Sequence, residues 1–537
     1  MLKRLSPIVG GKTLELPEPR CCPDCRQQRR LALRNDSHYY KNTCSSCKKS
    51  VISIYSPDKN VAVLCSDCFW SDQSDARQYG RDLDFSKTFA EQFAELKKTV
   101  PRLCLFNTQS ENSDYTVHSS GNKNCYMCAS TIRCQDVYFS DWAIDSRDSS
   151  DLVMCSNMEL CYACNDSRRC FGSEYLDLCS NVSDSMLCFD CHASQQLVGC
   201  VSLKNKTHMI LNKTADKKTM DETITKLKTD KTFFASFRKK FEALKLATPK
   251  RAAWNLSTEE SSGDYLQNSK NAIHCFSSMD LEDCRYVYDC IEMKNCMDTT
   301  RGSFSENLYE CKGTSDLSLS CFCNLGYQCD NLLYCDNMNS CSECFGCFGM
   351  KKAKYCILNK QFTKKEYEEL VPQIAEHMKK TGEWGEFFSI KLSSFGYNET
   401  KAYESFPITR TEALKRGWQW SDIDDTPPAG LKVIEAERLP DDIKNVPDDI
   451  LNLVIASETS RKPFRIIPQE LAFYRKQNLP LPHYHPHERL RAIALLENPR
   501  KLYDRTCGKC SKKIETTYAS DRPETVYCEE CYLKTVY

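Results

Sequence analysis

Eight cysteines near the two ends of the chain have a spacing that can bind a metal ion. Cys44 and Cys47 form one CxxC pair, and 17 residues separate it from the next pair, Cys65 and Cys68. Each CxxC turn presents two thiolates to one ion, and two such turns complete a tetrahedral four-sulfur shell, which is a common structural zinc site. The same spacing recurs near the other end in Cys507, Cys510, Cys528 and Cys531. The sequence therefore predicts two Zn²⁺ sites.

The segments around these cysteines resemble each other. Adding 463 to the N-terminal numbering aligns the two ends without a gap, matching Leu16 to Leu479 and Asn35 to Asn498 as well as all four cysteines. Between the CxxC pairs, both segments have the composition of β-strands. An ungapped match of this length indicates an internal duplication. We therefore predict an N-terminal zinc-ribbon module at 1–70 and a C-terminal zinc-ribbon module at 456–537.

Both modules resemble the family of zinc-ribbon domains. The resemblance rests on Lys462-Pro-Phe-Arg-Ile-Ile, Glu470, Phe473, Tyr474 and Leu479-Pro-Leu-Pro. The family has one CxxC pair before the phenylalanine and a second in an Arg-Cys-Pro-x-Cys-Arg phrase. The N-terminal copy keeps only the second pair, Cys22 and Cys25, which makes a third zinc site possible if Cys21, His38 or distant sulfurs contribute. The C-terminal copy departs from the family at all four positions, with Ser457, Ser460, His485 and Glu488.

Arginines follow the Cys22–Cys25 pair. Because zinc ribbons often bind nucleic acid, and clustered arginines can neutralise phosphates, RNA or DNA binding is an alternative function for the N-terminal module. The aligned C-terminal stretch keeps only Arg489. The candidate nucleic-acid-binding residues are Arg26, Arg29, Arg30 and Arg34.

The middle of the chain has a cysteine-phased repeat. Small or apolar residues recur in steps of nine from Cys125, and a second register starts three residues later at Cys128. A similar arrangement starts at Cys275, displaced by 150 residues and, near the end of the repeat, by 147. Short turns of chain with small inward residues are typical of a solenoid. We predict two cysteine-rich, β-helix-like solenoid repeats at 111–213 and 259–360.

The solenoid cysteines have two interpretations. Cysteine is small and weakly polar, so a stack of cysteines, serines and valines can fill a narrow interior. Alternatively, pairs such as Cys161 and Cys164 could bind metal, and the cysteine ladder would then store metal or sense the thiol redox state. The registration favours the core, because valine, leucine, methionine and serine replace cysteine at the same positions.

The remaining segments are expected to connect and cap the repeats. We predict a helical connector at 71–110, a basic helical insert at 214–258 and a helix followed by an aromatic and Pro-rich connector at 361–455, with a hinge at 424–430. The predicted fold class is therefore mainly β: a duplicated cysteine-rich β-helix-like solenoid flanked by duplicated zinc-ribbon modules, with capping helices.

Composition limits the possible functions. The 537 residues hold 73 basic and 73 acidic residues, so no net charge attracts nucleic acid or membrane. The N-terminus lacks the apolar stretch of a signal peptide and no apolar run approaches a membrane span, which predicts a cytoplasmic protein with reduced thiols. No phosphate-binding glycine loop, nucleophile elbow or His/Glu metal helix is present, so we expect no enzyme and no small-molecule substrate.

Over nearly its full length, the chain resembles an uncharacterised family of large cysteine-rich zinc-binding proteins from small uncultivated bacteria. The resemblance implies zinc binding but no activity. The sequence favours a non-enzymatic scaffold or protein-interaction protein, whose partner is another protein or a second copy bound through the zinc modules. The motifs that carry the resemblance begin at Cys22-Pro-Asp-Cys-Arg, Tyr55-Ser-Pro-Asp-Lys, Tyr79-Gly-Arg-Asp-Leu, Phe395-Gly-Tyr-Asn-Glu and Tyr527-Cys-Glu-Glu-Cys.

Overall fold

A computed structural model describes residues 1–537 except Asp424, Pro428 and Tyr537. Two residues of the predicted hinge, Asp424 and Pro428, thus lie outside the described residues. The chain forms two compact units, each made of segments that are far apart in sequence. The N unit comprises residues 1–105 and 253–421, and the C unit comprises residues 106–252 and 422–537. Each unit thus combines one predicted zinc module with the solenoid repeat from the distant part of the chain.

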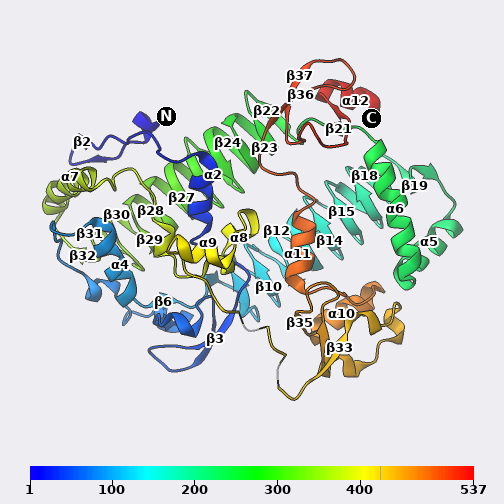
Figure 1. The fold of residues 1–537 in the computed structure, drawn as a ribbon, viewed down its shortest axis with the longest axis horizontal. Coiled ribbons are helices and arrows are strands. Elements are labelled where there is room, and N and C mark those ends of the chain that lie inside the picture. The colour runs from blue at the N-terminus through cyan, green and yellow to red at the C-terminus, as the bar shows by residue number, and fades with distance from the viewer. Residues whose placement is uncertain (424, 428, 537) are drawn as a thin grey trace. The chain divides into compact units, whose positions relative to one another are not determined.

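Each unit contains a coil of parallel strands in which successive rungs are offset by 12 residues (Figure 1). In the first coil, residues 107–210 of the C unit, Asp141 pairs with Val153. In the second coil, residues 256–357 of the N unit, Cys344 pairs with Cys356 in the same way. This parallel, solenoid-like pairing confirms the prediction of a mainly β protein, with 35% strand and 26% helix.

Within a rung, the backbone bends at every third residue. Asp145, Asp148 and Asp151 have φ of 49°, 46° and 56°, in the left-handed region, and the residue after each of them is buried. Aspartate and asparagine tolerate this region better than most residues. This explains why they are frequent between the inward positions. A 12-residue rung with a bend every three residues has four short sides and four inward side chains.

The nine-residue registers described only part of this pattern. Nine residues are three sides of a rung, so the steps from Cys125 and Cys128 do land on inward positions. The inward positions between these registers, including Thr131, Ser140 and Ser149, are equally buried. The inward period is therefore three residues, and the strand pairing gives a rung length of 12 residues.

Inward serines and cysteines also complete the backbone hydrogen bonding. The Cys161 N–H donates to Ser149 Oγ at 3.0 Å, one rung earlier, and the Cys347 N–H donates to Cys335 Sγ at 3.5 Å. The same Cys335 thiol donates to the Leu333 carbonyl at 3.3 Å. A small side chain that both donates and accepts thus fits the narrow interior, which accounts for the abundance of Ser and Cys.

Each coil consists of parallel strands of different lengths, followed by a two-residue antiparallel strand. The first coil contains β7 (Asn107–Thr108), β8 (Tyr115–Val117), β9 (Ser119–Ser120), β10 (Tyr126–Ala129), β11 (Gln135–Tyr138), β12 (Asp141–Ile144), β13 (Arg147–Ser156), β14 (Tyr162–Asn165), β15 (Glu174–Asp177), β16 (Ser180–Ser183), β17 (Met186–Phe189), β18 (His192–Val198) and β19 (Thr207–Ile210), then β20 (Lys213–Thr214). The second coil contains β22 (Leu256–Glu259), β23 (Gly263–Ile273), β24 (Cys275–Tyr288), β25 (Ile291–Lys294), β26 (Met297–Thr300), β27 (Ser303–Cys321), β28 (Asn324–Leu333), β29 (Asp336–Asn339), β30 (Ser342–Phe345) and β31 (Lys354–Ile357), then β32 (Lys360–Gln361).

In the N unit, the N-terminal segment and a helical segment cover the second coil. Phe89 packs against Tyr334 and Phe345 of the coil, and Tyr367 and Val371 are buried in the same cluster. The elements outside the coil are α1 (Leu2–Leu5), β1 (Ile8–Val9), β2 (Lys12–Thr13), α2 (Pro23–Leu31), β3 (Tyr40–Thr43), β4 (Ser50–Ser53), η1 (Pro57–Lys59), β5 (Val63–Leu64), α3 (Ser66–Trp70), η2 (Ala76–Tyr79), α4 (Phe89–Thr99), β6 (Arg102–Leu103), α7 (Lys364–Thr381), η3 (Ile390–Leu392), η4 (Tyr397–Glu399), α8 (Lys401–Ser405) and α9 (Arg410–Lys415).

In the C unit, the basic helical insert packs on the last strands of the first coil. Its Phe237 and Phe241 are buried, while Lys228 and Lys245 pair with Glu174 and Asp177 of the coil. The elements outside the coil are α5 (Lys217–Thr229), α6 (Lys231–Ala247), β21 (Lys250–Arg251), β33 (Lys432–Glu435), η5 (Ala436–Arg438), η6 (Ile443–Asn445), η7 (Asp448–Asn452), β34 (Leu453–Ala456), β35 (Pro463–Phe464), α10 (Pro468–Gln477), α11 (Pro486–Ala494), β36 (Tyr503–Thr506), β37 (Lys513–Thr516), β38 (Val526–Tyr527) and α12 (Glu529–Val536).

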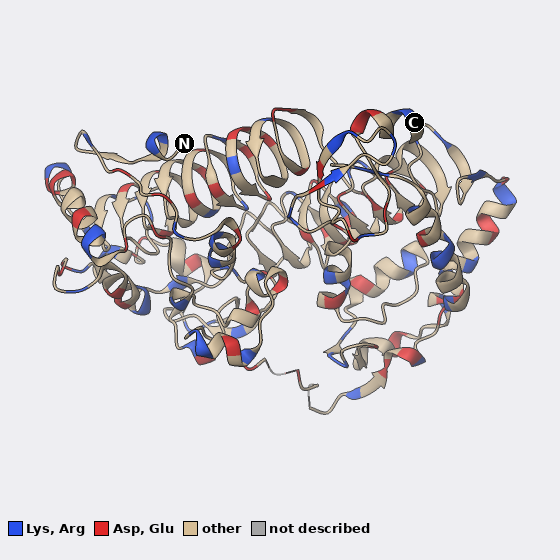
Figure 2. Ribbon diagram, turned by 45° about the horizontal axis from the view of Figure 1, so that its top comes forward, with Lys and Arg blue, Asp and Glu red and all other residues tan. Residues whose placement is uncertain are grey.

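The charged residues are distributed over the strands and helices with both signs interspersed (Figure 2). This agrees with the equal numbers of acidic and basic residues. In the described part of the chain, no helix combines the length and the apolar character needed to cross a membrane.

Candidate metal centres

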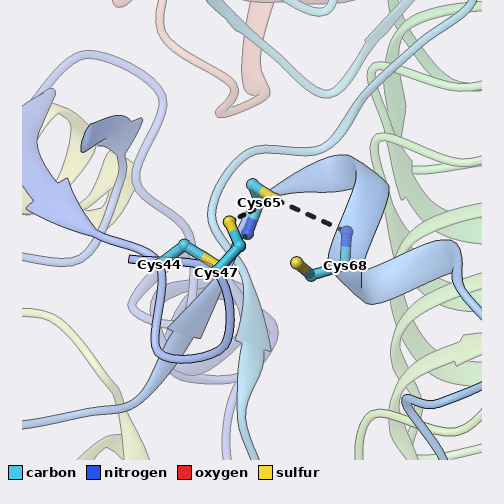
Figure 3. Close-up of side chains that lie close together, drawn as sticks. All are labelled: Cys44, Cys47, Cys65 and Cys68. Carbon is cyan, nitrogen blue, oxygen red and sulfur yellow. Dashed lines mark hydrogen bonds between the residues drawn. The ribbon is translucent and has the colours of Figure 1, made fainter. Parts of the chain in front are cut away.

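The first four-cysteine group lies where a hairpin meets a short helix. Cys44 and Cys47 occupy the turn between β3 and β4, Cys65 caps the N-terminus of α3, and Cys68 lies in its first turn. All four sulfur atoms lie within 4.8 Å of one another (Figure 3). The Cys47 and Cys65 sulfurs are 3.7 Å apart. A zinc–sulfur bond of about 2.3 Å gives a tetrahedron with an edge of about 3.8 Å, so this spacing fits zinc.

The second group, in the C unit, has the same geometry. Its four sulfurs also lie within 4.8 Å of one another, and Cys510 Sγ is 3.8 Å from Cys528 Sγ. The hairpin β36–β37 carries the first pair, and the turn from β38 into α12 carries the second. Both predicted ligand sets therefore converge, and each could hold a metal ion.

Backbone N–H groups stabilise one thiolate in each four-cysteine group. Burial acts to raise the pKa of Cys44, but N–H groups of Cys65, Cys47 and Ser46 outweigh it and lower this pKa to about 6. Cys507 has the same balance and a pKa of about 6, with amides of Cys510, Cys528 and Lys509. Burial and the neighbouring sulfurs instead raise the pKa of Cys65 to about 12. Four thiolates at this spacing therefore require a cation to offset their repulsion.

The possible third site lacks convergent ligands. Cys22 caps α2 and accepts a hydrogen bond from the Cys25 N–H at 3.4 Å, and both side chains are exposed. The other candidate ligand, His38, instead contacts Ser37 through Nδ1 at 3.2 Å. Among the described residues, only the two four-cysteine groups bring three or more ligand-type side chains together. The pair Cys22 and Cys25 is thus at most half of a metal site.

The coil cysteines are buried. Burial raises the pKa of Cys128, Cys155 and Cys170 well above the ordinary thiol value, which keeps them protonated and unsuited to bind metal, whereas hydrogen bonds from neighbouring thiols lower the pKa of Cys329 and Cys344. No coil cysteine belongs to a metal-type cluster within the described part of the chain. These observations favour the core interpretation of the cysteine ladder over metal storage.

The four arginines predicted to bind nucleic acid form ion pairs with acidic residues inside the N unit. Arg26 Nε lies 2.9 Å from Asp298 Oδ2, and Arg30 Nη1 lies 3.2 Å from Glu310 Oε2. Arg29 pairs with Glu310 and Glu386 at 2.8 and 2.7 Å.

The fourth arginine, Arg34, pairs with Asp36 at 2.7 Å. The residues Arg26, Arg30 and Arg34 are only 4%, 0% and 2% exposed, so their guanidinium groups do not form an accessible phosphate-binding surface. This placement corrects the predicted role of the cluster, because α2 uses its arginines to dock on the second coil.

An equivalent contact holds the C-terminal module on the first coil. Arg489, which aligns with Arg26 at the offset of 463, lies 3.4 Å from Asp151. Asp151 precedes Asp298 by 147 residues, as Tyr162 precedes Tyr309. The offset of 147, rather than 150, therefore relates the coil faces that bind the two modules. The two displacements differ by three residues, which is one side of a rung.

The neighbouring positions differ in character between the two units. Arg30 corresponds to Ile493, and Glu310 corresponds to Ala163, so two apolar residues stand at the positions that form the buried ion pair of the N unit. Ile493 and Ala163 belong to one buried cluster of the C unit. The coil acids Asp298, Glu310 and Asp151 were missed by sequence reasoning, although the 147-residue offset was a signal that could have related them.

The altered ligand positions of the C-terminal module also come together. Ser457 Oγ donates to Glu488 Oε2 at 2.7 Å and accepts from the His485 N–H at 3.1 Å. A hydrogen-bonded cluster thus stands where the zinc-ribbon resemblance expects two CxxC pairs. Nearby, His483 Nδ1 lies 3.1 Å from Glu458 Oε2, and burial lowers the pKa of His485 to about 3.

No family model matches the chain, and no curated protein sequence shows significant similarity to it. The family resemblances therefore stay predictions. The two four-cysteine groups agree with them but do not establish them.

Proposed function

We propose that this protein is a non-enzymatic, zinc-stabilised scaffold in which two zinc-ribbon modules each fasten one cysteine-lined coil. The observation that carries the proposal is the pair of equivalent contacts, Arg26 with Asp298 and Arg489 with Asp151. Both contacts join a helix that precedes a four-cysteine group to the side of a coil. Each module thus holds its coil through this contact, and its metal ion stabilises the folded module.

A duplication of both module and coil accounts for these contacts most simply. The contact partners follow the sequence offsets of 463 and 147, and the offset of 147 also relates Tyr309 to Tyr162. At the same interface, an ion pair in one unit is exchanged for an apolar pair in the other. Buried ion pairs and apolar pairs of similar volume can stabilise an interface to similar extents. A duplicated interface can therefore diverge in this way and still hold the module.

Zinc is the metal we assign to both groups. Four thiolates at tetrahedral spacing are the ligands that structural zinc prefers, and they leave no open coordination position to activate water. The metal would then stabilise the hairpin and helix that carry its ligands.

The function of the coils in this proposal is to present side chains at fixed intervals. Exposed pairs along the first coil, such as Arg133 with Asp145 and Arg147 with Glu159, join residues one rung apart at 2.7 Å. The repeated 12-residue spacing suits recognition of an extended surface of a protein partner, as in other repeat proteins.

Metal and thiol counts on the intact protein test the proposal. Native mass spectrometry of protein purified without added metal is expected to give two zinc ions per chain, and a thiol reagent is expected to reach most coil cysteines only after denaturation. A protein with no zinc, or with several further metals bound by native coil cysteines, would overturn the scaffold proposal. In the second case, metal handling would replace it.

A further inference from the structure

One cysteine pair lies outside both four-cysteine groups and outside the coils. Cys22 and Cys25 are exposed at the start of α2, whereas the described coil cysteines are buried. Cys22 is the N-cap residue, Pro23 follows at the first helical position, and Cys25 lies in the first turn. The Cys25 N–H donates to Cys22 Sγ at 3.4 Å. Two thiols on one helical turn, with the first one capping the helix, form an arrangement suited to thiol chemistry.

The helix that carries this pair is held firmly. Arg26 donates to the Cys21 carbonyl at 2.6 Å, which fixes the chain just before the helix, and also pairs with the buried Asp298. Arg30 anchors the next turn on Glu310. The contacts of Arg26 and Arg30 therefore fix the position of the two thiols, although the thiols take no part in these contacts.

The C unit offers a direct comparison. The residues aligned with Cys22 and Cys25 are His485 and Glu488, and Ser457 closes over them with two hydrogen bonds. In the N unit, the thiols stay exposed, and no further ligand-type side chains converge on them among the described residues. Two neighbouring exposed thiols without a metal shell can be oxidised together.

We infer that Cys22 and Cys25 form a reversible dithiol–disulfide pair that exchanges with the disulfides of small thiols or proteins. The Cys22 thiolate attacks one sulfur of the incoming disulfide, that S–S bond breaks, and the first thiolate leaves. Cys25 then gives up its proton, attacks Cys22 Sγ and releases the second thiolate. The protein pair loses two electrons and two protons, and the incoming disulfide becomes two thiols. The Cys25 N–H donates to Cys22 Sγ, which favours Cys22 as the attacking group.

The test uses the full-length, zinc-loaded protein and oxidised glutathione as the probe. After alkylation of the remaining thiols, peptide mass spectrometry of residues 21–26 is expected to show an internal disulfide between Cys22 and Cys25. Cys25→Ser should instead accumulate a mixed disulfide at Cys22, because no second thiol resolves it. Cys22→Ser should lower the reaction rate at least about tenfold, since the amide-stabilised thiolate is gone.

Cys21→Ser is the matched control, because it changes the adjacent thiol and leaves the pair intact. It should form the Cys22–Cys25 disulfide at the wild-type rate. Zinc content measured in parallel checks folding, and it should stay the same in all three variants. The inference fails if glutathione reacts no faster with this pair than with Cys47 or Cys510. It also fails if Cys22→Ser loses one zinc ion, which would make the pair part of a metal site.

Discussion

The Arg30 guanidinium lies 3.2 Å from the Glu310 carboxylate, and both side chains are almost fully buried. Arg29 shares the same carboxylate. The corresponding positions of the C unit hold Ile493, Ala163 and Ala492, which are all apolar. The same interface positions thus hold an ion pair in one unit and apolar residues in the other. Substitutions in the N unit can test whether the two sets of residues are interchangeable.

Removing only the acid should destabilise the N unit. Glu310→Ala takes one carboxylate away from two largely buried arginines, while Arg29 keeps Glu386 and Arg30 keeps Asp298. The cost should therefore stay below the roughly 3–5 kcal/mol of a buried charge that is left fully unpaired. The triple variant Arg29→Ala/Arg30→Ile/Glu310→Ala places the residues of the C unit at these positions and should recover part of this loss, because it removes the unpaired charges but leaves space that smaller side chains do not fill. Chemical denaturation monitored by hydrogen exchange in the N unit measures both effects. If the triple variant is as unstable as Glu310→Ala, the two contacts are not equivalent.

An exposed ion pair serves as a control that separates the effect of burial on stability from the effect of removing a charge. Arg133 and Asp145 form an exposed pair at 2.7 Å, and the Arg133 side chain is 63% exposed. Asp145→Ala should therefore change the free energy of unfolding by no more than about 1 kcal/mol. A loss as large as that of Glu310→Ala would contradict the argument from burial.

The C unit should become more stable as the pH falls through neutrality. Burial raises the pKa of Glu470 to about 7 and that of Asp151 to about 6, although Arg489 lies near both carboxylates and acts to lower both pKa values. A raised folded-state pKa means that the folded protein binds the proton more tightly than the unfolded chain. This contribution is complete at low pH and is lost as the pH rises through 7. For Glu470 alone, whose pKa rises from 4.5 to about 7, the expected size of the full contribution is on the order of 3 kcal/mol.

Comparison with Glu470→Gln isolates this effect. The pKa of His485 is lowered by burial, so that histidine acts in the opposite direction at acid pH. The difference in stability between wild type and Glu470→Gln, followed from about pH 6 to about pH 8, removes this contribution. A difference that does not change with pH would show that Glu470 is ionised throughout.

Each four-cysteine group should bind its own metal ion. Cys47→Ser and Cys510→Ser should each remove one zinc ion, and the double variant should remove both, because three thiolates and a hydroxyl do not retain zinc as strongly. Cys104→Ser is the control, since Cys104 is a buried cysteine of the N unit outside the group. Native mass spectrometry counts the ions. Loss of both ions from either single variant would mean that the sites are interdependent.

A coil cysteine should tolerate serine better than alanine. Cys335 accepts from the Cys347 N–H and donates to the Leu333 carbonyl. Serine can make both hydrogen bonds, so Cys335→Ser should cost less than about 1 kcal/mol. Cys335→Ala leaves a buried N–H without its acceptor and should cost about 1–3 kcal/mol. Thermal unfolding compares the two variants, and equal stability would contradict the hydrogen-bonding role.

Local sequence spacing predicted the metal groups well. Cys44 and Cys47, like Cys65 and Cys68, are close along the chain, and a CxxC turn forms from short-range geometry alone. The repeat was predicted less completely. The steps of nine found inward positions, but the rung length depends on which backbone groups pair across 12 residues, and several rung lengths divisible by three are compatible with the same sequence.

What the sequence by itself determined is the local chemistry: two sets of four thiolates, inward small residues at multiples of three, and two aligned modules. Only the tertiary structure decided that the N-terminal module packs on the second coil and that Arg26 meets Asp298, 272 residues away. The sequence of an arginine cluster is the same whether its side chains are exposed or buried. The difference is made by carboxylates from a distant segment, which offset the cost of burying the guanidinium groups.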